Sequence, residues 1–150
     1  MKPIAIAGWL ALVSTASAAD NPLKQVAGRY EVQSQCSVLG DNGYEPCGSE
    51  MRDSFVLTWT SDTSASFDLY SVQVNGHQCA LSGVAELQGG SLVYVDPKAP
   101  GRGQGITIQL VAGEIRFAYL PSEPAHDFRY CGTRASLSRI AFPLASRVHE

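Results

Sequence analysis

Four cysteines carry the clearest chemical signal in the sequence, because their number and spacing help to decide between catalysis, metal binding and cross-linking. They are Cys36, Cys47, Cys79 and Cys131. A catalytic cysteine needs a free thiolate beside a histidine, whereas an even number of cysteines in an exported protein is typical of disulfide bonds. Three pairings are possible. We favour Cys36 with Cys47, across a short glycine-rich loop, and Cys79 with Cys131, from a middle strand to the C-terminal region. The chain-entropy model gives these bonds about 3 and about 4 kcal/mol of stability respectively.

Acidic residues form two pairs whose spacing would suit acid–base chemistry. Asp41 and Glu45 are one pair, and Glu123 and Asp127 are the other. Two carboxyl groups catalyse such a reaction only where the fold holds them together in a partly desolvated cleft. Because both pairs lie in stretches rich in glycine or proline, we interpret them as solvated loop charges and predict no catalytic residue among them.

Histidine and serine motifs were the remaining candidates for catalysis or metal binding. His77 follows an Asn-Gly turn and His126 lies in a proline-flanked loop, and the chain has 3 histidines altogether. Zinc sites need three or four convergent ligands. The sequence also lacks the G-x-S-x-G and S-x-x-K motifs of serine hydrolases. We therefore predict no metal, no cofactor and no enzymatic activity.

Aromatic side chains accompany the acidic ones in the same loops. Tyr44, Tyr119 and Phe128 lie in or beside them. Aromatic residues next to charged ones on a rigid, disulfide-linked loop are typical of surfaces that bind another protein. The candidate partner-binding residues are Asp41, Tyr44, Glu45, Glu123, His126 and Asp127.

The first residues have the pattern of a secretory signal peptide. Lys2 precedes an apolar run over residues 4–13, and the small residues Ala16-Ser17-Ala18 follow it. The apolar run is about half the length that a membrane-spanning helix needs. We predict a cleavable signal peptide at residues 1–19, a single β domain at residues 20–150, and a location in the periplasm or outside the cell without membrane insertion.

The charge of the chain excludes one class of partner. The 11 basic and 14 acidic residues give a net charge of −3, and removal of Lys2 with the signal peptide would leave about −4. Proteins that bind nucleic acid concentrate positive charge on one surface, because phosphate contacts supply most of the affinity. No cluster of lysine and arginine is present, so we predict no nucleic-acid partner.

Alternation of apolar and polar residues with a period of two predicts the fold class. About eight short strands joined mostly by tight turns indicate a mainly β protein, a small antiparallel β-barrel or sandwich stapled by two disulfides, and we favour the barrel. Asn75-Gly76 and Ala112-Gly113 predict hairpin turns, whereas residues 37–53 read as an exposed loop. Apolar residues change parity between Phe67 and Val72, which leaves two alternatives open: a bulge, or cover on both faces of that strand.

Two stretches resemble small exported bacterial β proteins, which include periplasmic lysozyme inhibitors and immunity proteins against cell-wall-degrading toxins. The stretches are residues 75–83, Asn-Gly-His-Gln-Cys-Ala-Leu-Ser-Gly, and residues 130–137, Tyr-Cys-Gly-Thr-Arg-Ala-Ser-Leu. The resemblance implies a non-catalytic barrel that blocks a peptidoglycan-cleaving enzyme with a loop. The Ser/Gly-rich loop ending in Lys-Tyr of the c-type lysozyme inhibitors is missing, so no inhibitory residue can be transferred.

The sequence therefore favours a periplasmic inhibitor or immunity protein that inserts a loop into the cleft of a lysozyme, muramidase or effector toxin. A negative net charge would suit a basic target. One alternative is a small-ligand or envelope-component binding barrel without catalytic activity, which would need an internal cavity. Another is an exported enzyme of unrecognised type, which would need convergent titratable residues in a cleft. The oligomeric state is left open.

Overall fold

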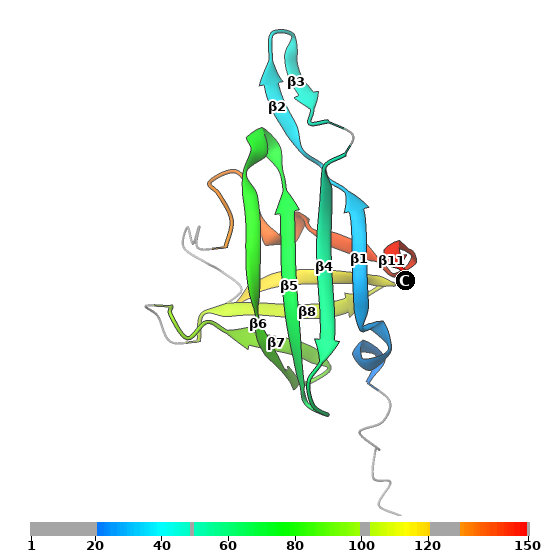
Figure 1. Ribbon diagram of the computed structural model, residues 1–150. Coiled ribbons are helices and arrows are strands. Elements are labelled where there is room, and N and C mark those ends of the chain that lie inside the picture. Colours follow the sequence, from blue (N-terminus) through cyan, green and yellow to red (C-terminus); the bar gives the residue numbers. More distant parts are fainter. Residues whose placement is uncertain (1–20, 49, 100–102, 121–129, 150) are drawn as a thin grey trace, which may run out of the picture.

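A nine-stranded antiparallel sheet forms a nearly closed barrel in the computed structural model, which describes residues 21–48, 50–99, 103–120 and 130–149 (Figure 1). In Figure 1, β7 and β8 run across behind the longer strands β4, β5 and β6, so the sheet forms two walls that cross. The strands of the sheet are β1 (Gly28–Gln33), β4 (Arg52–Trp59), β5 (Ser64–Val72), β6 (Gln78–Gln88), β7 (Ser91–Val95), β8 (Gly105–Val111), β9 (Glu114–Leu120), β10 (Ala141–Pro143) and β11 (Arg147–Val148).

The remaining elements lie outside the nine-stranded sheet. They are the strands β2 (Ser37–Gly40) and β3 (Gly43–Pro46) and the short 3-10 helices η2 (Pro22–Val26), η3 (Val74–Gly76), η4 (Leu137–Arg139) and η5 (Leu144–Ser146). Within the described ranges, no helix has the length and apolar character needed to cross a membrane. The predicted signal peptide, residues 1–19, lies outside the described residues.

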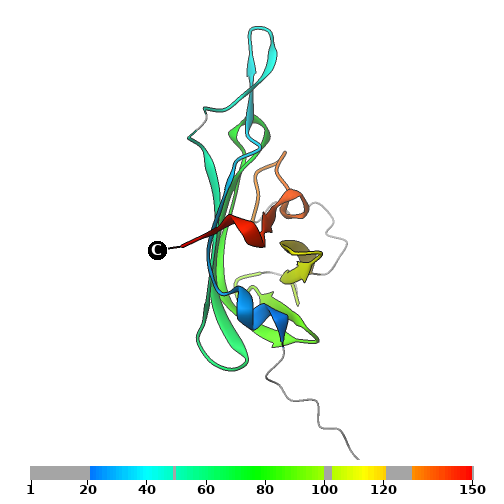
Figure 2. The ribbon, with the colours of Figure 1, turned by 90° about the vertical axis from the view of Figure 1, so that its right-hand side faces the viewer.

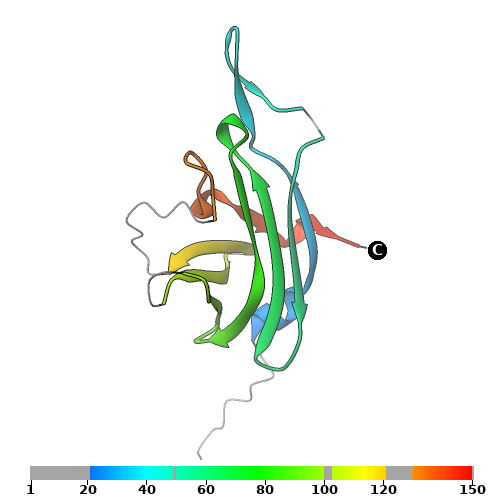
Figure 3. The same cartoon turned by 60° about the vertical axis from the view of Figure 1, so that its left-hand side comes forward.

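Closure of the barrel depends on the C-terminal segment. Strands β4 to β9 each pair with their neighbours in sequence, and β6 curves along its length as it passes from one wall to the other (Figure 3). The strand β10 then pairs with β9, with Phe142 opposite Ile115. After η5 the chain continues into β11, which pairs with β1, with Arg147 opposite Tyr30. The segment from β10 to β11 thus pairs with β9 at one end and with β1 at the other. These two pairings close the row of antiparallel strands into a barrel.

The interior of the barrel is filled by one continuous cluster of apolar side chains. At its centre the Phe55 ring makes an edge contact with Phe117, at 5.1 Å between ring centroids, and stacks on Phe142 at 5.7 Å. Aromatic pairs in these geometries each stabilise the core beyond their burial alone. The prediction of a mainly β fold is confirmed, and of the two architectures the barrel is correct.

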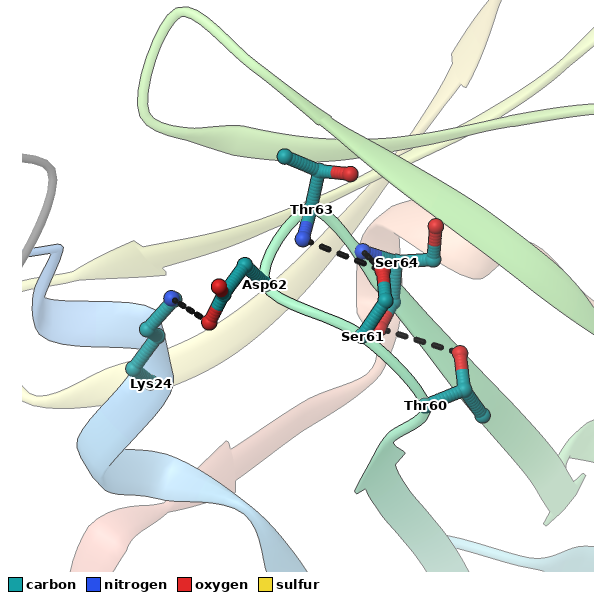
Figure 4. A network of polar contacts seen from close by, with 6 residues as sticks. All are labelled: Lys24, Thr60, Ser61, Asp62, Thr63 and Ser64. Atoms are coloured by element: carbon teal, nitrogen blue, oxygen red, sulfur yellow. Dashed lines mark hydrogen bonds and ion pairs between the residues drawn. The ribbon is translucent and has the colours of Figure 1, made fainter.

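The helix η2 covers one end of the barrel. It buries Leu23 and Val26, and the Tyr30 hydroxyl donates a hydrogen bond to the Val26 carbonyl at 2.7 Å. Burial raises the pKa of that hydroxyl, against a smaller opposing effect of the Arg147 charge. On the surface, Lys24 reaches the turn between β4 and β5, with 3.2 Å between its Nζ and Asp62 Oδ1 (Figure 4).

The tight turns differ partly from the prediction. Asn75 and Gly76 both have positive φ, at 56° and 70°, and a hairpin does join β5 to β6. The connection is longer than the predicted two-residue turn, because it contains η3 and closes with a bond from the Gln73 N–H to the His77 carbonyl at 2.8 Å. Two-residue turns with positive φ at both positions occur at Gly89-Gly90 and at Ala112-Gly113.

Ala112 offers a simple route to higher stability. Its φ is +51°, a conformation in which the Cβ of an L-residue is strained by about 1–2 kcal/mol. Ala112→Gly removes that strain and loses roughly 0.5–1 kcal/mol of chain entropy, so urea denaturation should show a gain of about 0.5 kcal/mol. The control is Ala118→Gly on the exposed face of β9, which should lose about 0.5–1 kcal/mol. A loss in both variants would contradict the strain at Ala112.

The segment predicted as an exposed loop, residues 37–53, contains two paired strands and the start of a third, so this prediction is wrong in part. The strands β2 and β3 pair within it, and β4 already begins at Arg52. Glycine and proline mark the ends of these strands, which are too short for their alternation to stand out. Both disulfides have the favoured pairing, Cys36–Cys47 and Cys79–Cys131.

Candidate functional site

The strands β2 and β3 form a separate two-stranded hairpin that projects beyond the end of the barrel (Figures 1 and 2). Gly40 pairs with Gly43, and Asp41 and Asn42 form the turn at the tip. An aspartate–asparagine–glycine sequence suits such a turn, since these residues tolerate the backbone conformations it needs. The hairpin therefore extends the molecule without contributing to its core.

A disulfide closes the base of the hairpin where it leaves the barrel. Cys36 and Cys47 lie 5.2 Å apart between their Cα atoms, and the Cys47 N–H donates to the Cys36 carbonyl at 3.0 Å. The next hydrogen bond toward the barrel joins the Ser34 N–H to the Met51 carbonyl at 3.0 Å. An isolated two-stranded hairpin is marginally stable in water, so the disulfide and these bonds are what hold its shape.

The two faces of the hairpin carry different side chains. Leu39 is paired with Tyr44, and the residues are 70% and 58% exposed. Val38 is paired with Glu45 on the opposite face, because neighbouring residues of a strand point to opposite sides. One face thus presents an aliphatic and an aromatic side chain together in solvent, the arrangement that is enriched at the centre of protein interfaces.

The hairpin also contacts the end of the barrel. Its strand β2 packs against η3, and the Tyr44 hydroxyl lies 3.5 Å from Arg134 Nη1. The face with Leu39 and Tyr44 is therefore continuous with the surface formed by the C-terminal segment around Arg134.

A buried carboxylate secures the point where the hairpin joins the barrel. Asp53 is 7% exposed and lies near the start of β4. Its Oδ1 accepts bonds from the Ser34 hydroxyl and, at 2.9 Å, from the Val72 N–H, and its Oδ2 accepts from the Ser71 hydroxyl at 2.8 Å. A buried charge is tolerated when it is hydrogen-bonded in this way. The carboxylate links β4 and β5 to the residues that lead into the hairpin.

Comparisons with protein-family models, with curated proteins and with solved structures found no match.

The structure separates the predicted partner-binding residues. Asp41 lies in the exposed turn, Tyr44 on the face with Leu39, and Glu45 on the other face. Because Asp41 and Glu45 are both exposed, the hairpin does not give them the desolvated surroundings that acid–base catalysis needs. The remaining candidates, Glu123, His126 and Asp127, lie outside the described residues.

Sequence reasoning missed two residues of this site, Leu39 and Arg134. A signal for Leu39 was present, since Leu39 and Tyr44 flank a Gly-Asp-Asn-Gly stretch symmetrically, as expected of a hairpin with an apolar pair. No local signal identifies Arg134, because its position beside Tyr44 results from contacts between segments far apart in the sequence.

A groove of about 290 Å³ lies at the seam where β1 approaches β10. It is lined by residues that include Gln33, Asp53, Ser71, Gln73, Arg139 and Pro143. The Gln73 side-chain amide donates a hydrogen bond to the Ser136 carbonyl at 2.9 Å and accepts one from the Ser136 N–H at 3.0 Å. The Asp53 carboxylate accepts hydrogen bonds from Ser71 and Val72. Because the Asp53, Ser71 and Gln73 side chains already bond within the protein, they are not prepared to bind a small ligand.

Metal binding has no support in the described part of the chain. There, His, Cys, Asp and Glu residues form no group of three or more that could hold a metal ion.

Proposed function

We propose that this protein is an exported inhibitor or immunity protein that binds a peptidoglycan-cleaving enzyme through the hairpin of β2 and β3. The observation that carries the proposal is the exposed pair of Leu39 and Tyr44 on a hairpin that projects from the barrel. Such an element is narrow enough to enter a cleft and presents apolar surface that water solvates poorly.

The rigidity of the hairpin supports binding to a protein. A loop that is already ordered loses less conformational entropy on association, so more of the contact energy appears as affinity. The disulfide between Cys36 and Cys47 and the buried Asp53 provide that order here.

The filled interior favours this proposal over a ligand-binding barrel. Large side chains that include Tyr30, Phe55 and Phe142 are almost fully buried in one cluster. A barrel that carries a small molecule needs a cavity of several hundred Å³ among such residues.

The class of target follows from the resemblance to lysozyme inhibitors and immunity proteins and from the predicted export signal. Disulfide bonds persist in oxidising compartments such as the periplasm, where these enzymes act. The negative net charge, −3 for the whole chain and about −4 without the predicted signal peptide, would speed association with a basic hydrolase.

A hydrolysis assay tests the proposal directly. The mature protein is titrated into lysozymes, muramidases and peptidoglycan amidases that digest labelled cell walls, with bovine serum albumin as the control for nonspecific effects. We expect stoichiometric inhibition of at least one enzyme. Full activity of every enzyme at an excess of the protein would refute the proposed function.

The hairpin disulfide should be needed for inhibition but not for the barrel. In the double variant Cys36→Ser, Cys47→Ser, inhibition should weaken by more than about 10-fold, because an unstapled two-stranded hairpin is only marginally ordered. Hydrogen exchange should accelerate in β2 and β3 and stay slow in β4 to β6.

The matched control for that variant removes the other disulfide. Cys79→Ser, Cys131→Ser should lower the stability of the whole barrel by about 4 kcal/mol, since the bond closes a loop of 52 residues. Equal inhibition by the wild type and by the variant without the hairpin disulfide would show that hairpin order does not matter.

A further inference from the structure

A second groove, of about 400 Å³, lies beside the hairpin. It runs between η3 and the segment that precedes and includes η4. Its lining residues are Val74, Thr133, Arg134, Ala135, Ser136 and Arg139. Two of them are arginines with exposed side chains, and nothing in the proposed function so far uses them.

The backbone that carries the two arginines is firmly anchored. Cys131, just before it, is buried and bonded to Cys79. In the middle, Ser136 exchanges two hydrogen bonds with the Gln73 side chain, at 2.9 and 3.0 Å. The side chain of Leu137 is fully buried. Both guanidinium groups thus extend from a fixed support, so ordering them on binding costs side-chain entropy only.

Neither arginine forms an ion pair with a residue in the described ranges. The ion pairs there are Lys24 with Asp62, Arg29 with Glu31, and Arg116 with Glu114. The contact of Arg134 is with the uncharged Tyr44 hydroxyl. Among the described residues of this chain of net charge −3, the groove is therefore a local site of positive charge.

The groove and the apolar face of the hairpin form one surface. Tyr44 connects them, since it is paired with Leu39 across the hairpin and its hydroxyl lies 3.5 Å from Nη1 of Arg134, which lines the groove. The carboxylate of Glu45 belongs to the opposite face. A partner that covers Leu39 and Tyr44 would also cover the groove and exclude water from it.

We infer that this groove binds an acidic side chain of the protein partner that the hairpin engages. The inference deepens the proposed function and rests on it. A guanidinium group donates two parallel hydrogen bonds to a carboxylate, and this pairing strengthens when the partner's surface excludes water. Leu39 and Tyr44 supply apolar contact, and Arg134 and Arg139 select a partner with a carboxylate beside its cleft.

Arginine variants test the inference in the hydrolysis assay. Arg134→Ala and Arg139→Ala should each weaken inhibition by about 10-fold, and the double variant by about 100-fold. The matched control is Arg29→Ala, at the start of β1 and already paired with Glu31, which should leave inhibition within about 2-fold. Circular dichroism verifies that each variant is folded.

Two further readouts separate a carboxylate contact from a general structural effect. The variant Arg134→Lys, Arg139→Lys should recover part of the loss, because lysine keeps the charge without the paired geometry. Raising sodium chloride from roughly 50 mM to roughly 500 mM should weaken the wild type more than the double alanine variant.

The outcomes distinguish the two levels of the proposal. If the wild type inhibits an enzyme and the double alanine variant inhibits it equally well, the groove has no such role and the proposed function stands. If the wild type inhibits no enzyme, the proposed function fails and the inference fails with it.

Discussion

Replacing Leu39 and Tyr44 with alanine is expected to weaken inhibition by more than about 100-fold. Each side chain is large, exposed in the free protein and placed on one face of a projecting hairpin. Truncating a residue that acts as a binding hot spot costs about 2 kcal/mol or more, and two such losses correspond to roughly a thousandfold change if they add.

The same double variant should fold as well as the wild type. Neither residue belongs to the apolar cluster of the barrel, and exposed substitutions usually change stability by no more than about 0.5 kcal/mol. Thermal unfolding followed by circular dichroism checks this. A large loss of inhibition with an unchanged unfolding temperature would locate the binding surface on the hairpin.

The opposite face of the hairpin supplies the matched control. Val38→Ala with Glu45→Ala changes the same number of side chains on the same two strands, and inhibition should change by less than about 5-fold. If this variant lost inhibition and the variant at Leu39 and Tyr44 kept it, the partner would bind the face with Val38 and Glu45, and our assignment of the binding face would be wrong.

Local patterns in the sequence predicted the longer strands of the sheet well, because each of them has its own alternation. In β8, Ile106 and Ile108 are fully buried while Gln109 is exposed, and the Ala112-Gly113 turn follows as the residue types indicate.

Closure of the barrel could not be predicted in the same way. It depends on Phe142 pairing at one edge of the sheet and Arg147 at the other, and a segment of a few residues has no alternation that would identify these partners. The sequence also left open whether β5 contains a bulge or is covered on both faces. Ser71 and Val72 are both buried, so this end of the strand is covered on both faces, and its pairing with β6 continues without a bulge.

The candidate site was predicted only in part. Tyr44 and Asp41 belong to the hairpin, and their position was identified through the flanking cysteines. The pairing of Tyr44 with Leu39 requires knowledge of the hairpin register, which a glycine-rich stretch leaves undefined. The arginine groove could not be predicted without knowledge of a tertiary contact, because Arg134 is 90 residues from Tyr44 in sequence.

Loss of the buried carboxylate should cause the largest change in stability among single substitutions at the base of the hairpin. Asp53→Ala is expected to lower the free energy of unfolding by about 3–4 kcal/mol. The Val72 N–H and the Ser71 hydroxyl, both buried, would lose their acceptor, and an unsatisfied buried donor costs about 1–3 kcal/mol. Urea denaturation measures the difference.

Two comparisons show whether the hydrogen bonds of Asp53 are the cause. Asp53→Asn keeps one acceptor oxygen at nearly the same volume, so it should lose less, about 1–2 kcal/mol. Asp68→Ala, at an exposed position on the neighbouring strand β5, should change stability by no more than about 0.5 kcal/mol.

Because the Asp53 carboxylate also holds the Ser34 hydroxyl next to the hairpin, Asp53→Asn should in addition accelerate hydrogen exchange in β2 and β3 before it does so in β6. If exchange rose equally in all of these strands, Asp53 would stabilise the barrel as a whole and have no separate role in ordering the hairpin that we propose to bind the partner.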